Sequence, residues 1–403
     1  MRLRMMLLAI SWLASPGLAR AQAVPPEPAA PPLAVEATPV APEPISPAPA
    51  PPSVAPEPAP ALTPAPPEVP PDTGVTLKLY GDTQFSYRNR GAVKTTFEAA
   101  HLDLFFTYDV GRVAFLSEVF LEGRSTNEVA VDVERLQIAY LFSNALRVRA
   151  GRSHTAFGYY SDTYHHGNLF ELTTERPIGI AFEDAGGLLA AHIVGVGADG
   201  TFEGGTAGAL RYDVEIGNGR LADPSAVAVS RAGKNEKMLN VRLRWITPID
   251  GLLIGVNGMY DVVPAREDAN PALARNDVSQ VLAGAHAVYT EHGVHMIAEG
   301  YLLHDTLSGG SAYDTWFGFV ELGYRFGAFT PYLRPEYIRF PRGGDPIFQQ
   351  ADGPWAGTRS VFDARVGVKW VALPQLALKL EVDRVAHDTA PQESVNVKAA
   401  FGF

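Results

Sequence analysis

The stretch that decides the fold is Val395–Phe403, VNVKAAFGF. Every second residue of this stretch is apolar, whereas Asn396 and Lys398 between them are polar. Successive side chains of a β-strand point to opposite faces, so a period of two predicts a strand with one apolar and one polar face. This strand is expected to run to Phe403.

The same alternation recurs along the chain from Val75 onward. It is clearest at residues 75–87, 102–108, 210–216, 239–245, 362–370 and 376–383. Alternating segments of about ten residues, separated by turns, are typical of a transmembrane β-barrel. A soluble β-sandwich alternates as well, so the pattern needs further support.

Three features favour the membrane. The bulky face of each expected strand is almost free of charge, as the lipid face of a barrel must be. Aromatic residues fall near strand ends, which suits the girdles at the two interfaces; they are Tyr80, Tyr108, Tyr140, Trp245, Tyr260, Tyr324 and Trp370. The links alternate between short ones and long ones, the long ones being 159–187, 219–237, 262–276, 305–312 and 341–358.

These observations predict an all-β fold, a transmembrane antiparallel barrel of about sixteen strands over residues 74–403. With an even strand number and a long first link, both barrel ends fall on the periplasmic side. The glycine-rich link at 198–209 is long for a periplasmic turn, which leaves the strand number open by two.

Composition excludes several classes of protein. The net charge of -11 argues against a nucleic-acid partner, which would require a basic face. The chain has no cysteine, so no disulfide framework supports it. Beyond the first residues there is no apolar run of about 18 residues, the length that a transmembrane helix requires.

The first residues predict export. Arg2 and Arg4 precede the apolar run Met5–Ala14, and Ala21–Ala23 fits a cleavage site, so residues 1–23 are interpreted as a signal peptide. Residues 24–73 are rich in proline and alanine, a composition that predicts a disordered, extended periplasmic linker. Two interpretations of this linker stay open, a plain spacer and a segment that binds the cell wall.

The final strand resembles the C-terminal strand of bacterial outer-membrane proteins. In those proteins the terminal aromatic residue and alternating apolar residues are a recognition signal for the barrel-assembly machinery. The resemblance implies the same role for Val395, Val397, Phe401 and Phe403, and a location in the outer membrane in contact with its lipids.

A second resemblance covers 151–177, GRSHTAFGYYSDTYHHGNLFELTTERP. It is similar to the region that follows a strand in porins related to the phosphate-selective porin family. Members that select phosphate depend on rings of arginine and lysine in the pore. No comparable ladder of cations maps onto this sequence.

By the strand count, the link 159–187 is the third extracellular loop, and in general porins that loop folds inward and narrows the channel. It carries the charged residues Asp162, Glu171, Glu175, Arg176, Glu183 and Asp184. Expected strands contribute lumen-facing cations on the pore wall, namely Arg147, Arg149, Arg211, Arg242, Arg244, Arg365 and Lys369. An acidic loop opposite a basic wall would set a transverse field that selects solutes by charge and size. The alternative is a surface lid with solvated carboxylates.

Carboxylates on the same walls argue against strong anion selectivity and leave the sign of the preference open. The spacing of His154, His165 and His166 matches no metal motif, so neither a metal nor a cofactor is expected. Ser153, His154 and Asp162 lie close in sequence, but proximity is no evidence for a triad and no GxSxG motif occurs.

The function that the sequence favours is a porin, a water-filled channel for passive diffusion of small polar or ionic solutes. Two alternatives are an outer-membrane barrel enzyme of lipase or protease type, and a structural barrel that ties the outer membrane to the cell wall. A homotrimer is expected by analogy with general porins.

Overall fold

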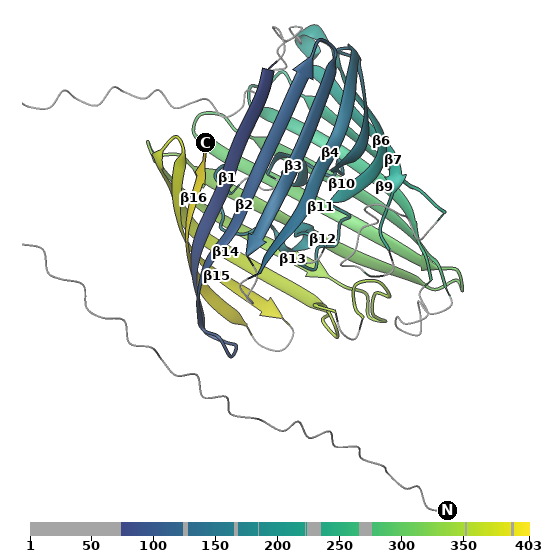
Figure 1. Ribbon diagram of the computed structural model, residues 1–403. Coiled ribbons are helices and arrows are strands. Elements are labelled where there is room, and N and C mark those ends of the chain that lie inside the picture. Colours follow the sequence, from purple (N-terminus) through teal and green to yellow (C-terminus); the bar gives the residue numbers. More distant parts are fainter. Residues whose placement is uncertain are drawn as a thin grey trace, which may run out of the picture. The chain divides into compact units, whose positions relative to one another are not determined.

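The computed structural model describes residues 74–123, 128–164, 168–183, 185–221, 223, 235–265, 276–350, 353–387 and 391–403. Within these residues sixteen strands form one closed antiparallel barrel, as predicted (Figure 1). Each strand pairs with its neighbours in sequence, and the last strand pairs with the first. The expected signal peptide (1–23) and linker (24–73) lie outside the described residues and stay predictions.

The strands are β1 Gly74–Arg88, β2 Thr95–Val110, β3 Val113–Gly123, β4 Val129–Ser143, β5 Leu146–His154, β6 His192–Glu203, β7 Ala209–Asn218, β8 Met238–Ile246, β9 Leu252–Val263, β10 Val278–Tyr289, β11 Val294–Leu307, β12 Ala312–Tyr324, β13 Phe329–Arg339, β14 Ser360–Leu373, β15 Leu376–His387 and β16 Gln392–Gly402. Three short helical turns accompany them, α1 Tyr160–Thr163, η1 Ile178–Ile180 and η2 Gly205–Ala207. Among the described residues, no helix has the length and apolar character needed to cross a membrane.

Along the strands, the burial of polar and apolar residues is the reverse of that in a soluble protein. In β15, Lys379 and Glu381 are buried, whereas Leu380 and Val382 between and beyond them are about half exposed. Around the barrel, large apolar side chains are exposed on the outer surface, whereas many ionisable side chains are buried in the interior. A lipid environment imposes this arrangement, because a charge on the outer face would cost about 2–4 kcal/mol at the midplane.

Links at one end of the barrel are tight turns. In the link between β10 and β11, His292 (φ 55°) and Gly293 (φ 80°) both take left-handed conformations, which suits a tight hairpin turn. The link between β6 and β7 is only 204–208, so β6 and β7 absorb most of the glycine-rich 198–209 and the count of sixteen holds.

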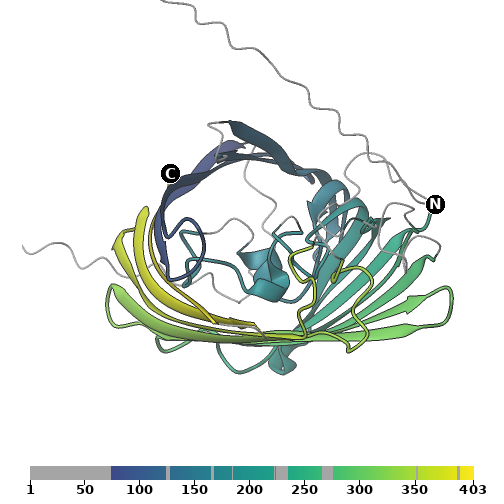
Figure 2. The ribbon, with the colours of Figure 1, turned by 90° about the horizontal axis from the view of Figure 1, so that it is seen from below.

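Links at the other end are mostly longer, with one correction. The expected long link at 305–312 is short, since β11 extends to Leu307 and β12 begins at Ala312. The longest link between described strands is 155–191, between β5 and β6, and its described residues lie inside the barrel (Figure 2).

The seam between β1 and β16 runs from the pair Tyr80–Gly402 to the pair Arg88–Ser394. Leu79 and Phe403 exchange two backbone hydrogen bonds of 2.9 and 2.8 Å, so the pairing extends to the last residue. Of the expected assembly signal, Val395, Val397 and Phe401 lie on the face of β16 opposite its buried polar residues, and Phe403 follows the last residue of the strand. Their recognition by an assembly machinery stays a prediction.

Candidate functional site

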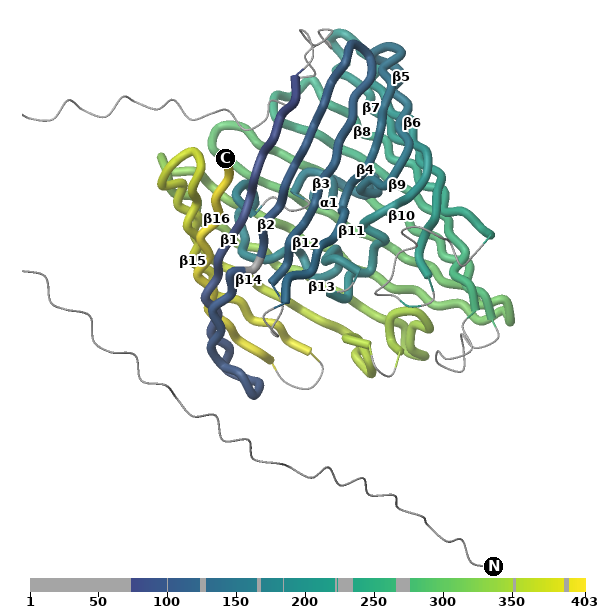
Figure 3. Tube along the Cα trace, viewed as in Figure 1, coloured from purple at the N-terminus to yellow at the C-terminus, as the bar shows by residue number. Residues whose placement is uncertain are grey.

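The candidate site is the lumen segment, residues 155–191, together with the wall around it. This segment leaves the wall after His154 and returns at His192, which lies directly opposite His154 in the strand register. In between, its described residues cross the barrel interior; α1 is labelled in Figure 3, and Figure 2 shows this teal helix inside the ring of strands. Its placement follows from two sets of contacts, one apolar and one polar.

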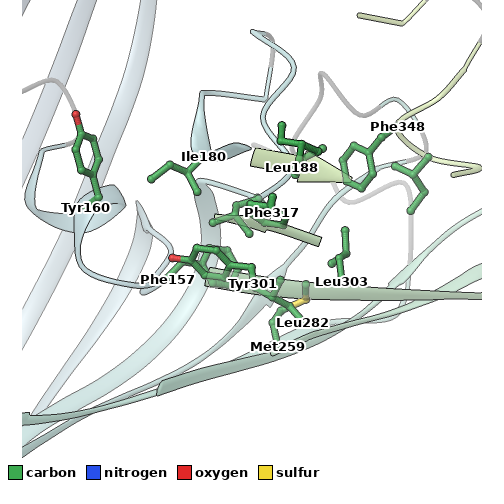
Figure 4. Packing of buried hydrophobic residues seen from close by; sticks show 14 of the residues in the cluster. Phe157, Tyr160, Ile180, Leu188, Met259, Leu282, Tyr301, Leu303, Phe317 and Phe348 are labelled. Atoms are coloured by element: carbon green, nitrogen blue, oxygen red, sulfur yellow. The ribbon is translucent and has the colours of Figure 1, made fainter. Parts of the chain in front are cut away.

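The apolar contacts attach the lumen segment to strands β9–β12. Phe157 and Ile180 of the segment belong to one buried cluster with Tyr301 and Phe317 of the wall (Figure 4). The rings of Tyr301 and Phe317 stack at 4.9 Å. Apolar residues therefore face the lumen on this part of the wall, and burying them against the segment removes them from water.

Glu299 of β11 is the polar anchor for the start of the segment. Its carboxylate accepts hydrogen bonds from the backbone N–H groups of Tyr159 and Tyr160, both at 2.7 Å. The Tyr301 hydroxyl donates to the same carboxylate at 2.5 Å. Arg242 of β8 adds a bond to the Gly158 carbonyl oxygen at 2.8 Å.

A second set of anchors holds residues 169–175. Lys369 donates to the carbonyl oxygens of Leu169 (2.6 Å) and Phe170 (2.9 Å). The carbonyl oxygen of Thr173 accepts from Lys379 at 2.6 Å, and its hydroxyl accepts from Arg334 at 2.5 Å. Further wall groups join at Thr174 and Glu175, through Glu381 and Arg334.

Most of the expected wall cations form ion pairs with carboxylates or hydrogen bonds with the lumen segment. Arg242 and Arg244 pair with Asp213, and Arg242 also reaches Asp162 of the segment at 2.8 Å. Buried arginines are stable here because carboxylates of the wall and the segment neutralise them. The remaining wall cations behave alike: Arg149 pairs with Asp199 and Glu215, Arg365 with Asp363, Glu336 and Glu381, and Lys369 binds backbone carbonyls.

Two of the predicted wall residues lie apart from these anchors. Arg147 pairs with Asp199 near the short-turn end, and 42% of its side chain is exposed. Arg211 is half-buried and lies opposite Arg244 in the register of β7 and β8. The expected transverse field across the opening stays a prediction, and most of these cations contact carboxylates or the segment directly.

The open part of the lumen lies along β1–β5. A cavity of about 860 Å³ is lined by residues of β1–β5 and by the lumen segment, and reaches Arg88 and Glu122 toward the long-link end. A second cavity of about 480 Å³ reaches Thr76 and Thr107 toward the short-turn end. The segment thus fills one side of the barrel and leaves polar cavities on the other.

The predicted charges of the segment divide into exposed and buried groups. Half of the Glu175 side chain and 37% of the Asp162 side chain are exposed. Glu171 and Glu183 are buried, and Arg176 is half-buried, its guanidinium donating to the carbonyl oxygens of Tyr164 and Ile180 at 3.2 Å each. Asp184 lies outside the described residues, as do His165 and His166.

The wall sets the protonation of the exposed carboxyls. Burial alone would raise the pKa of Asp162, but Arg242 and Arg244 outweigh it and hold this pKa well below the usual value. Burial also opposes ionisation of Glu175, yet Lys398 and Arg365 lower its pKa. Burial raises the pKa of Glu171 despite the neighbouring Lys379. The lowered pKa values favour the charged forms of Glu175 and Asp162 at neutral pH.

Sequence reasoning missed several residues on the open wall. Asp132, Glu134 and Arg152 line the larger cavity, and Glu118 and Arg135 line the smaller one. The alternation VAVDVERLQI in β4 carries the signal that could have found Asp132 and Glu134, whereas Arg135 is out of phase with it. The Ser153–His154–Asp162 arrangement does not form, because neighbouring residues of β5 point to opposite faces and His154 is the buried one.

No protein-family model matches the sequence, and no curated protein matches it either. Solved structures do match in fold. An anion-selective porin from Comamonas acidovorans has a TM-score of 0.57 at 13% identity, covering 82% of this chain and 100% of that chain. The outer-membrane channel DcaP of Acinetobacter baumannii has a TM-score of 0.56 at 12% identity, covering 82% and 97%.

A loop-deletion variant of OmpT, an outer-membrane protein of Vibrio cholerae, is equally similar. Its TM-score is 0.57 at 13% identity, with 82% of this chain and 99% of that chain covered. At such identities the likeness establishes the shared barrel fold.

Proposed function

We propose that this chain is an outer-membrane diffusion channel for small polar or ionic solutes. One observation carries the proposal: the lumen segment is bound to the β7–β16 side, and polar cavities of about 860 and 480 Å³ remain along β1–β5. Small solutes would pass between the segment and this wall. The solved structures described as a channel and a porin share the barrel.

The membrane and the assembly are part of the same proposal. Lipids would contact the apolar outer surface, with the tight turns and the linker 24–73 on the periplasmic side. One solved structure of Vibrio cholerae OmpT is described as a trimer form, with a TM-score of 0.56. We extend that arrangement to this chain, so three parallel channels would act per assembly.

Exposed charge favours a weak preference for cations. The exposed carboxylates along the passage are Asp132 (57%), Glu175 (50%) and Asp162 (37%). Arg152 and Lys398 beside them are more enclosed, with 9% and 3% of their side chains exposed, whereas Arg88 and Lys78 are exposed toward the two ends of the cavities. Between those ends the carboxylates are the more exposed charges, which supports a weak preference for cations, while strong selection for phosphate would require a ring of exposed cations.

The test is single-channel conductance of the refolded mature protein in a planar bilayer under a salt gradient. Discrete long-lived openings with a reversal potential on the cation side are expected. A folded barrel that conducts nothing would refute the channel. Open channels with clear anion preference would refute only the assignment of selectivity.

A further inference from the structure

Three side chains that the channel proposal does not use come together on the lumen wall. Glu134 of β4, His154 of β5 and His192 of β6 each offer a ligand atom, and these atoms all lie within 4.8 Å of one another. All three residues are buried, with 5–6% of their surface exposed. They come from three adjacent strands, so the cluster extends across the strands along the inner surface of the wall.

The strand register sets the two histidines side by side. His154 and His192 are direct partners in the pairing of β5 with β6, and direct partners point to the same face. Their rings lie 5.7 Å apart at 70°. Because β5 ends at His154 and β6 begins at His192, the lumen segment begins and ends at this pair.

A β-bulge brings Glu134 to the same place. The consecutive residues Glu118 and Val119 of β3 pair with Arg135 and Val133, so Glu134 is the extra residue of β4. A bulge changes the direction of a side chain at one position without altering the strand elsewhere. Here Glu134 lines the larger cavity and Arg135 lines the smaller one, although they are neighbours in sequence. Glu134 also contacts Nε2 of His192.

We propose that Glu134, His154 and His192 bind a divalent transition metal ion such as Zn²⁺. Two imidazoles and one carboxylate are a donor set that suits Zn²⁺, with at least one position left for water or solute. This site is independent of whether the barrel conducts.

Outer carboxylates support the histidines. Glu183 Oε2 lies 3.5 Å from His192 Nδ1, and Glu118 Oε2 lies 3.5 Å from His154 Nε2. Metal-binding histidines commonly direct the other ring nitrogen to a carboxylate, which fixes the ring and raises its basicity. Two arginines also face the cluster, but each has another acidic partner: Arg135 contacts Glu118, and Arg152 lies 3.7 Å from Asp132 and 3.8 Å from Glu134.

Both cavities give access to the cluster. Glu134 and His192 line the larger cavity, and His154 lines the smaller one. A bound ion would therefore sit where the two meet the wall, within reach of solutes from either end.

The experiment uses the full refolded barrel in detergent, treated with a chelator and then titrated with Co²⁺ while its visible absorption is followed. We expect one Co²⁺ per chain and its displacement by Zn²⁺. Replacing a ligand, by Glu134→Gln or His154→Gln, should weaken binding by at least about 100-fold. Glu183→Gln, which removes an outer carboxylate, should weaken it by about 10- to 100-fold.

His295→Gln is the matched control, because His295 also lies against a buried glutamate, Glu321, at 2.8 Å but outside the cluster. It should bind Co²⁺ like the original protein. Each variant is first checked for the shift in gel mobility that a folded barrel shows on heating, and Glu134→Gln preserves the side-chain shape if His154→Gln does not fold. Absence of saturable Co²⁺ binding to the original chain, or equal binding by Glu134→Gln, would overturn the proposal.

Discussion

Gly81 and Phe401 lie directly opposite each other in the pair of strands that closes the barrel. A Cβ atom added at Gly81 would lie 2.7 Å from Cζ of Phe401 and 2.9 Å from the carbonyl oxygen of His101. The ring of Phe401 therefore occupies the space that a side chain at position 81 would need. Aromatic cover of a strand glycine also shields the backbone.

Gly81→Ala should destabilise the barrel by about 1–3 kcal/mol, because the ring or the neighbouring strand must move. Gly74→Ala is the matched control on the same strand, since a Cβ there would meet nothing within 4 Å. Urea unfolding of the two variants checks the prediction. Equal stability of both would contradict the assignment of the contact.

Phe403→Ala should separate assembly from stability. The ring is 75% exposed, whereas the backbone of Phe403 makes the two hydrogen bonds to Leu79. The substitution should lower the amount of barrel assembled in cells while leaving the refolded protein almost as stable as before. Deleting Phe403 should impair both, because the hydrogen bonds are lost as well. Unchanged assembly of Phe403→Ala would remove the basis for the terminal signal.

Asp132→Asn combined with Glu175→Gln should move the reversal potential toward anions, because both exposed carboxylates face the larger cavity. Asp314→Asn provides a control of equal exposure, since 57% of both the Asp132 and Asp314 side chains is exposed and Asp314 does not line either cavity. The measurement is the same salt-gradient experiment. A shift of equal size in the control would indicate that surface charge alone acts.

Glu299→Gln should loosen the lumen segment. The carboxylate accepts from two backbone N–H groups and one hydroxyl, and an amide cannot accept all three, so about 1–3 kcal/mol of stability should be lost. Current noise should rise, and limited proteolysis should cut within 155–191. Glu291→Gln, an exposed change in the turn before β11, serves as the control. If the Glu299→Gln channel showed no added current noise and resisted proteolysis, the apolar contacts alone would be enough to hold the lumen segment in place.

Asp162→Asn should reveal a pH-dependent anchor. The pKa of Asp162 is lower in the folded barrel than its ordinary value of 3.8, so its ion pair with Arg242 stabilises the fold above that pH. As the pH falls below 3.8, the carboxyl takes up a proton more readily in the unfolded chain, and this stabilisation is lost. The difference in Tm between the original protein and the variant should therefore be largest near neutral pH and shrink in acid. A constant difference would contradict the ion pair.

The strands were predictable because a barrel wall repeats one local rule. Lys379 and Glu381 alternate with Leu380 and Val382 in the sequence, and the structure separates them between lumen and outer surface. Strand number followed from the same rule together with the turns. Even the doubtful link at 198–209 proved to be two strand ends around a five-residue turn region, 204–208.

The site was less predictable because its contacts join positions far apart in sequence. Glu299 binds Tyr159, which is 140 positions away, and Lys369 binds Leu169 across 200 positions. The residues next to Arg242 in the sequence do not indicate whether this lumen-facing arginine contacts the lumen segment or faces a water-filled channel. The bulge at Glu134 is likewise invisible to a strict period of two, since it depends on the pairing with β3.

Closure by β1 and β16 has a consequence for biogenesis. All other pairings join consecutive strands, so hairpins can be added one by one to a growing sheet. Such a sheet keeps two bare edges, each ready to pair with foreign strands, until the first and last strands meet. Both edges disappear in that single late event. A chain interrupted anywhere before β16 would be left unsealed and recognisable as unfinished, so the topology itself provides a checkpoint between complete and incomplete molecules.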